Sequence, residues 1–397
     1  MPGPLPDGEP VPADGSLPDD AVARAGRNGF GVYVHVPFCA SRCGYCDFNT
    51  YTASEASPEG YLDALLGELR MAGKVISPER VDTVFVGGGT PTLLDPGDLA
   101  RVLDAIDATW GLAPGAEVTT EANPESVGPE SLRALRRAGF TRLSLGMQSV
   151  APHVLRVLDR RHTAGRAPRA AVEAREAGFE HVNLDLIYGT PGETAEDFAE
   201  SLAAVVGAGV DHVSAYALIV EDGTRMAARM RRGELPYPDD DVAADRYLAA
   251  DAALTAAGFQ WYEVSNWATS EAARCAHNML YWTGGDWWGL GPGAHSHVGG
   301  VRWWNVKHPS AYASRLKDGT SPGHGRELLT AEDEHMEDVM LRVRLRDGIA
   351  LAEVDAAGAA RAYENGLLDP GAHAAGRLSL TLRGRLLADA VVRDLLP

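Results

Sequence analysis

Apolar residues recur along the chain with the spacing of a strand in some segments and of a helix in others. The alternation between these two kinds of segment predicts the elements of the fold. From Gly31 the segment GVYVHVPF has the apolar content of a buried strand, and five later segments share it: VDTVFVGGG, EVTTEAN, RLSLGMQS, HVNLDLIYG and HVSAYALIV. Stretches with helical spacing separate them, at about 60–75, 96–109, 129–138, 166–178 and 194–207. Strands that alternate with helices of this length predict right-handed βαβ units and a parallel sheet.

Six such units favour an α/β fold with a barrel or partial (β/α)6 barrel, whose functional loops follow the carboxyl ends of the strands. The unusual residues fall at those ends. A cysteine cluster follows the first strand and GGGTPT (87–92) the second, Glu121 and Asn123 close the third, Gln148 the fourth, and Asp185 lies in the fifth. One such residue could cap a helix or form a turn, but several on one rim predict a site.

The pattern changes near both ends of the chain. After about 240 a helix is expected at 240–257, and aromatic segments follow, so that all but one of the 8 Trp lie between 261 and 304. The main domain is expected to span 30–320. Residues 325–397 predict a small helical domain with a winged-helix-like end. Residues 1–29, rich in Pro, Gly and Asp, are expected to be a disordered tail.

Composition narrows the class of protein. With 45% hydrophobic and 23% charged residues among 397, the chain is typical of a globular protein with a sizeable core. A net charge of -19 argues against broad nucleic-acid binding, which needs a basic face. No run approaches the ~20 apolar residues of a membrane span, and the N-terminus has no signal-peptide pattern. Four cysteines, three of them clustered, favour a metal site in a reducing cytoplasm.

The cysteine cluster has the spacing Cys39-x3-Cys43-x2-Cys46. Iron–sulfur clusters are held by thiolates, and a loop of this spacing can wrap three corners of a four-iron cube, leaving one iron for an outside ligand. Zinc is the alternative, with His35 as a fourth ligand. The glycines of GGGTPT allow a ligand close to the backbone, and its amides and Thr90 can bind amino or carboxylate groups.

The cysteine loop, with Tyr45 before its third cysteine, resembles that of the radical S-adenosylmethionine (SAM) superfamily. The resemblance implies a [4Fe-4S] cluster on Cys39, Cys43 and Cys46, with SAM on the open iron. Together, YVHVPFC, VGGGTPT, TEANPES, LGMQS, DLIYGTPGET and the terminal LTLRGRLLADAVVRDLL resemble the oxygen-independent coproporphyrinogen III oxidase family, over nearly all the chain from Gly31.

That resemblance also implies a SAM site. The positions that match the cluster-bound SAM are Tyr33, Gly88 and Glu121, and those that match a second SAM in the oxidase are Gly89, Thr90, Gln148, Arg160 and Asp185, with Tyr45 beside the cluster. Ile219 and His295 match only loosely. Whether a second SAM binds, and whether SAM is cleaved, stays open.

Two features separate the chain from the true oxidase. Phe48 stands where the oxidase has a further cysteine, and the oxidase has a longer N-terminal segment near its substrate. The stretch His277-Asn278-x2-Tyr281-Trp282 resembles the HNxxYW motif of the heme-chaperone branch of the same family, where it is implicated in heme binding.

Imidazole is a common axial ligand of heme iron, and aromatic side chains offer flat apolar area to a porphyrin. His277 is therefore the expected heme ligand, and Cys275 a second ligand or a covalent attachment point. A histidine hydrogen-bonded within the core is the plainer interpretation of His277. His295 and His297, in GAHSH, are expected to line the SAM rim.

Three functions stay open. The first is a heme chaperone that passes heme to acceptor hemoproteins, such as respiratory-chain proteins, which would bring it to the membrane surface as a peripheral partner. The second is the oxidase, which removes two propionate carboxyls from coproporphyrinogen. The third is a radical SAM enzyme with another substrate. The resemblance also implies a homodimer, and a C-terminal domain that covers the barrel instead of binding DNA.

Overall fold

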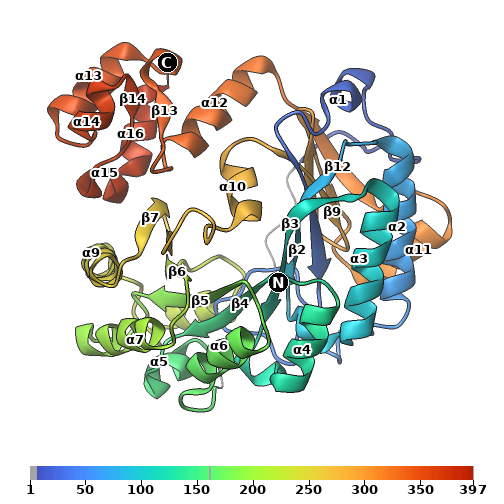
Figure 1. Ribbon diagram of the computed structural model, residues 1–397, viewed down its shortest axis with the longest axis horizontal. Helices are drawn as coiled ribbons and strands as arrows, with labels where there is room; N and C mark the ends of the chain where they lie inside the picture. The colour runs from blue at the N-terminus through green and yellow to red at the C-terminus, as the bar shows by residue number, and fades with distance from the viewer. Residues whose placement is uncertain (1–6, 161, 397) are drawn as a thin grey trace.

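The computed structural model describes residues 7–160 and 162–396, and these form one long curved sheet with helices on its outer face (Figure 1). Within those residues the sheet has twelve strands, in the order β12-β11-β10-β9-β1-β2-β3-β4-β5-β6-β8-β7. Its central strands all run parallel: β1 (Phe30–Val36), β2 (Val81–Gly88), β3 (Leu112–Ala122), β4 (Arg142–Gln148), β5 (His181–Tyr188) and β6 (His212–Ala217).

Helices connect these strands and confirm the predicted alternation: α2 (Tyr61–Val75), α3 (Pro96–Trp110), α4 (Pro129–Arg137), α5 (Pro152–Val157), α6 (Arg166–Glu176) and α7 (Ala195–Gly207). Local chemistry sets where they begin. The Asp95 side chain accepts from the amide of Gly97 ahead of α3, and Thr194 and Asp197 form a capping box at the start of α7. The apolar faces of α2, α3, α4, α6 and α7 pack on the sheet in one continuous core, and α5 packs in a smaller cluster with α8 (Arg225–Arg231).

The sheet does not close on itself, which confirms the α/β class and a partial barrel. Beyond β6 the chain forms α8 (Arg225–Arg231), α9 (Asp240–Ala256), the hairpin β7 (Gln260–Glu263) and β8 (Asn266–Ala268), and then α10 (Ala276–Trp282). It returns to the other side as β9 (Asp286–Leu290), which pairs parallel to β1, followed by β10 (His295–Val298), β11 (Val301–Asn305), α11 (Pro309–Lys317) and β12 (Gly323–Leu328).

The C-terminal domain begins later than predicted. Residues 325–328 belong to β12, which pairs with β11 in the main sheet, so the domain starts at α12 (Ala331–Arg342). It continues with β13 (Ile349–Ala350), α13 (Ala356–Glu364), α14 (Pro370–Ala374), β14 (Arg377–Leu378), α15 (Leu382–Leu386) and α16 (Ala388–Leu395) around a small core of its own. None of the described helices is long and apolar enough to cross a membrane.

The prediction of a disordered tail over 1–29 is wrong for the part of it that the structure describes. Residues 1–6 lie outside the described part, but Glu9 forms an isolated bridge with Arg326 at the edge of β12, through backbone bonds of 3.0 and 2.9 Å. Further on, α1 (Asp19–Arg24) buries Ala21 against the sheet. A few backbone bonds, the scattered apolar side chains of Val11, Leu17 and Val22, and ion pairs of Glu9 and Arg24 hold this segment, so its low overall apolar content did not indicate it.

Two contacts join the ends of the chain to the sheet edges. Glu9 occupies the β12 edge, and Leu345, just after α12, bridges to Glu263 of β7 at the opposite edge. The Arg385 guanidinium forms bonds of 2.8 and 3.0 Å to the Asp251 carboxylate of α9 and lies 4.4 Å from the Trp261 ring centroid. The C-terminal domain is therefore seated on α9 and β7, at one end of the sheet (Figure 1).

Candidate functional site

A cavity of about 400 Å³ lies where the central strands end, and it brings most of the predicted site residues together. Its lining includes Cys39, Cys43, Tyr45, Cys46, Gly88, Gly89, Thr90, Glu121, Gln148, Arg160 and Asp185. Tyr33 lines two adjoining cavities instead, both of which share Glu121 with this one. Ile219 is 69% exposed and lines none of these cavities.

The cysteine loop follows β1 and is tied down at both ends. The Cys39 amide donates to the carbonyl of Tyr51 at 2.9 Å, and the Gly44 amide donates to the carbonyl of Leu158 at 3.1 Å. The Arg160 guanidinium lies 3.5 Å from the Cys43 sulfur. Burial raises the pKa of the Cys39 thiol and raises that of Cys46 to about 12. Thiolates at these positions therefore need a nearby cation, which iron would provide.

The residues present fit a cluster better than a single zinc ion. Both ring nitrogens of His35 are already bonded, Nδ1 to the Tyr33 hydroxyl at 2.9 Å and Nε2 to the Asn49 carbonyl at 2.8 Å. In the described part of the chain, no group of three His, Cys, Asp or Glu side chains is placed to hold one metal ion. A four-iron cube does not need such convergence, because each cysteine binds a different iron.

Two glycines shape the part of the wall that lies beside Cys39. Gly88 has φ +109°, and a Cβ there would lie 2.6 Å from Cε1 of His35, so this position requires glycine. At Gly89 a Cβ would lie 2.5 Å from the Phe38 carbonyl oxygen and 3.0 Å from the Cys39 sulfur. The absence of side chains here lets the backbone of GGGTPT pack directly against the end of β1 and the start of the cysteine loop.

Two buried carboxyl groups face the same cavity. Burial, aided by the negative charge of Asp185, raises the pKa of Glu121 to about 7, although the Gly88 amide donates to Glu121 at 2.9 Å. Burial also raises the pKa of Asp185, against the opposing effect of bonds from Asn183 and Ser144. A positively charged ligand would relieve the cost of ionising both groups. SAM has an amino group and a sulfonium, so the donor set fits it.

Gln148 is held in a strained conformation. Its φ is +61°, where side chains other than glycine are rare, and the β4–β5 register is irregular between Gly146 and Gln148. Arg160 maintains the arrangement: its Nη2 donates to Oε1 of Gln148 at 2.8 Å and to the Gly146 carbonyl at 3.1 Å. Strain of this kind concentrates at functional sites, which agrees with the predicted role of both side chains.

His277 and Cys275 line a smaller, adjoining cavity of about 160 Å³, which shares Glu121, Ser144 and Asp185 with the first one. His277 is 1% exposed, and its Nδ1 and Nε2 both lie 2.8 Å from a hydroxyl oxygen, of Thr83 and of Tyr281. Its ring stacks on Phe85, and burial lowers its pKa to about 4. In this structure His277 is thus a bonded core histidine, the plainer of the two interpretations.

Two residues that sequence reasoning missed hold this region in place. Glu117 of β3 accepts from the amides of Ala276 and His277, both at 3.1 Å, and from the Cys275 thiol at 3.4 Å. Arg142, 1% exposed, donates to Glu117 at 2.7 Å. Burial raises the pKa of Cys275, so this thiol keeps its proton. The sequence indicated this pair only in that each of two predicted buried strands contains a charged residue, Glu117 in one and Arg142 in the other.

The chain is similar to known proteins in both sequence and fold. The pattern of the radical SAM superfamily matches residues 33–205. Heme chaperone HemW of Mycobacterium tuberculosis is 58% identical over 373 residues, which cover 92% of this chain and 95% of that protein. This chain belongs to the HemW family. HemW of Bacillus subtilis is 33% identical over 323 residues, 80% of this chain and 84% of that protein.

A solved structure shares the fold of this HemW family member. Coproporphyrinogen III oxidase (HemN) from Escherichia coli, described as a radical SAM enzyme, matches with a TM-score of 0.79 at 25% identity, over 94% of this chain and 91% of that one. The resemblance that the sequence motifs indicated is therefore confirmed. Membership of the radical SAM superfamily implies a [4Fe-4S] cluster and SAM. The three loop cysteines lie in the cavity of about 400 Å³, which we call the cluster cavity.

Proposed function

We propose that this protein is a heme chaperone, which binds heme and a SAM-coordinated [4Fe-4S] cluster and passes the heme to acceptor hemoproteins. The observation that carries the proposal is the 58% identity to HemW of M. tuberculosis over 95% of that protein, which is named a heme chaperone. Respiratory-chain proteins as acceptors, peripheral membrane contact, a cytoplasmic setting and a homodimer all remain predictions.

The cluster cavity supports the cofactor part of the proposal. Cys39, Cys43 and Cys46 would hold three irons, and SAM bound to the fourth would give the site access to one-electron chemistry. Gly88 and Gly89 line the same cavity as the cysteines, where SAM would bind. The other predicted SAM residues, Tyr33, Tyr45, Thr90, Glu121, Gln148, Arg160 and Asp185, would orient it and exclude water.

The role of the HNxxYW segment needs a direct test. Ligation of heme by His277 would require one of its ring nitrogens to give up its bond, to Thr83 or to Tyr281, and the ring to leave a cavity of about 160 Å³. Cys275 lies in the same cavity and is bonded to Glu117. Both remain predicted ligands, and the segment could instead act through the aromatic side chains that it positions.

A second candidate is the oxygen-independent coproporphyrinogen III oxidase. The favouring observation is the TM-score of 0.79 to HemN, together with a cavity that keeps all but one of the predicted SAM positions in its lining. Against it, Phe48, which replaces the oxidase's further cysteine, is 56% exposed at the rim of the cluster cavity.

The test is an anaerobic heme titration followed by transfer. The reconstituted protein is titrated with heme, and the heme-loaded form is then mixed with an apo form of a b-type cytochrome while the Soret band is followed. Saturation near one heme per chain, with transfer to the apocytochrome, supports the chaperone. Conversion of coproporphyrinogen III to its decarboxylated product, without stoichiometric heme binding, would establish the oxidase instead. If neither result is obtained, the remaining function is that of a radical SAM enzyme with another substrate.

A further inference from the structure

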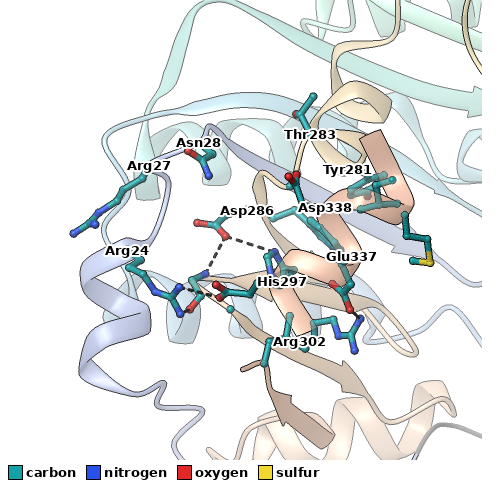
Figure 2. A pocket seen from close by; sticks show the side chains of 18 residues that line it. Arg24, Arg27, Asn28, Tyr281, Thr283, Asp286, His297, Arg302, Glu337 and Asp338 are labelled. Carbon is teal, nitrogen blue, oxygen red and sulfur yellow. Dashed lines mark hydrogen bonds and ion pairs between the residues drawn. The ribbon is translucent and has the colours of Figure 1, made fainter. Parts of the chain in front are cut away.

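A hollow larger than the cluster cavity lies away from it, between the N-terminal segment, α10, β10 and α12 (Figure 2). It has a volume of about 570 Å³, within the 300–1,000 Å³ typical of small-molecule sites. The inner cavity at His277, of about 160 Å³, is well below that range. We call the larger hollow the His297 groove, since His297 of β10 lies at its centre in Figure 2.

One ring nitrogen of His297 faces polar partners within the protein, and the other is available to a ligand. Its Nδ1 lies 3.4 Å from the Gly285 carbonyl oxygen and 3.6 Å from Oδ1 of Asp286. No hydrogen bond to Nε2 is found within residues 7–160 and 162–396, and the side chain keeps 15% of its surface exposed. An imidazole whose Nδ1 faces a carboxylate or carbonyl is set to bind a metal through Nε2, since that partner fixes the tautomer and raises the basicity of the ligand.

Asp286 is itself fixed in place. It is 5% exposed, accepts from the Gly26 amide at 2.8 Å and from the Gly299 amide at 2.9 Å, and so cannot turn away from His297 (Figure 2). A buried carboxylate built against a histidine in this way gives that histidine a defined orientation. Asp286 thus supplies the carboxylate partner that a metal-ligating imidazole needs on its other ring nitrogen.

The groove combines apolar walls with charges of both signs, because Arg24 and Arg302 are paired there with Glu334 and Glu337. Trp287 lies 5.3 Å from the His297 ring, and Leu341 and the partly exposed Met340 of α12 add apolar surface. Arg27 is exposed at the rim and forms no ion pair with any described residue, so it is available to a carboxylate. Apolar walls, one imidazole and a guanidinium without an acidic partner among the described residues are features that a heme with propionate groups could use.

The HNxxYW segment reaches this groove through its tyrosine. Tyr281 lines the groove as well as the inner cavity, packs on Trp287 at 4.5 Å between ring centroids, and lies 2.8 Å from Nε2 of His277 through its hydroxyl. His277 therefore fixes the orientation of an aromatic side chain in the groove wall. The motif can affect a ligand in the groove although its histidine is enclosed.

From these observations we propose that heme is held in the His297 groove, with Nε2 of His297 as its axial ligand, and that His277 is a positioning residue that acts through Tyr281. The proposal rests on the proposed function, because it names the place where the transferred heme is bound. It assigns the propionate side to Arg27 and leaves the cluster cavity to SAM.

The first test compares three cavity variants, His297→Gly, His277→Gly and the control His324→Gly, which alters an exposed histidine of β12 outside the groove. Each is titrated anaerobically with heme, with and without free imidazole. His297→Gly should bind heme at least about tenfold more weakly, as loss of even an outer partner costs 10–100-fold, and imidazole should restore the axially ligated Soret spectrum. His277→Gly should bind more weakly but keep the wild-type spectrum.

A second pair of variants does not depend on the histidines. Met340 and Met336 are 39% and 42% exposed on the same helix, but only Met340 lines the groove. Met340→Glu should therefore weaken heme binding by repelling its carboxylates, and Met336→Glu should leave it unchanged, while both variants fold because both positions are exposed.

The outcomes separate this inference from the function on which it rests. If the variants His297→Gly and Met340→Glu bind heme as well as the wild-type protein does, the groove is not the heme site. The chaperone function would still stand in that case. Loss of the axial ligand spectrum in His277→Gly, restored by imidazole, would place heme at the inner cavity and overturn the proposal in the same way. Absence of heme binding by the wild type would refute the chaperone function itself.

Discussion

The buried pair of Glu117 and Arg142 predicts an unusually large effect for a nearly isosteric change, Glu117→Gln. Both carboxylate oxygens face donors: Oε1 accepts from the His277 amide and the Cys275 thiol, and Oε2 from the Ala276 amide and the Arg142 guanidinium. A glutamine must therefore turn its own N–H groups toward one set of donors, and it leaves Arg142 without a countercharge.

The magnitude follows from burial. The Arg142 and Glu117 side chains keep only 2% and 11% of their surface exposed, so the guanidinium cannot recover its hydration when the partner is neutral. Breaking a buried pair in this way costs about 3–5 kcal/mol of the free energy of unfolding. The matched control is Glu180→Gln, which removes the partner of Arg136 at a site where the Glu180 side chain is 58% exposed and the pair contributes only about 0–1 kcal/mol.

The assay is urea unfolding of the full chain, followed by tryptophan fluorescence at neutral and acidic pH. Burial opposes ionisation of Glu117, but Arg142 and the two amides outweigh it and lower the pKa below its ordinary 4.5. A carboxyl group with a depressed pKa in the folded state stabilises the protein fully above the unfolded value, and that contribution disappears as the pH falls through the folded value. The difference between wild type and Glu117→Gln should therefore shrink below about pH 4.5. A cost at neutral pH no larger than that of Glu180→Gln would refute the reasoning.

Three other predictions concern the cluster cavity. Replacing any of the three loop cysteines by Ala should abolish the cluster's visible absorption and its iron after anaerobic reconstitution, while Cys275→Ala should keep both; a full cluster in a loop variant would contradict the assignment. Asp185→Ala should weaken SAM binding by at least about tenfold in calorimetry and leave heme binding unchanged, as loss of one charge-assisted hydrogen bond would; equal loss of both ligands would argue against separate sites. Gly88→Ala should lower the free energy of unfolding by about 1–3 kcal/mol, whereas Gly207→Ala, where a Cβ meets no atom within 4 Å, should not.

Much of the barrel could be predicted from the sequence, because its signals are local. Each strand-to-helix switch is a change of period within a few residues, and the three cysteines lie within one loop. The convergence of Glu121, Gln148 and Asp185 followed from the rule that parallel strands end at one edge. These features depend on position within an element, which the sequence displays directly.

What could not be predicted depends on partners distant in the chain. The sequence offers His277 as a candidate ligand, but it does not show that Thr83, 194 residues away, already occupies one of its nitrogens. Nor does it show that β9 returns beside β1, which brings His297 and Asp286 next to the N-terminal segment. Whether a polar side chain is available is decided by such long-range pairings, and residue type alone does not reveal it.

The two isolated bridges at the ends of the sheet have a practical consequence for anyone who shortens this protein. An open sheet exposes two rows of backbone donors and acceptors that can recruit a strand from another molecule. Here Glu9 occupies part of one row and Leu345 part of the other. A variant trimmed to Phe30, where the barrel begins, would uncover β12 and gain a tendency to aggregate. Residues that look dispensable by composition therefore protect the native protein from self-association.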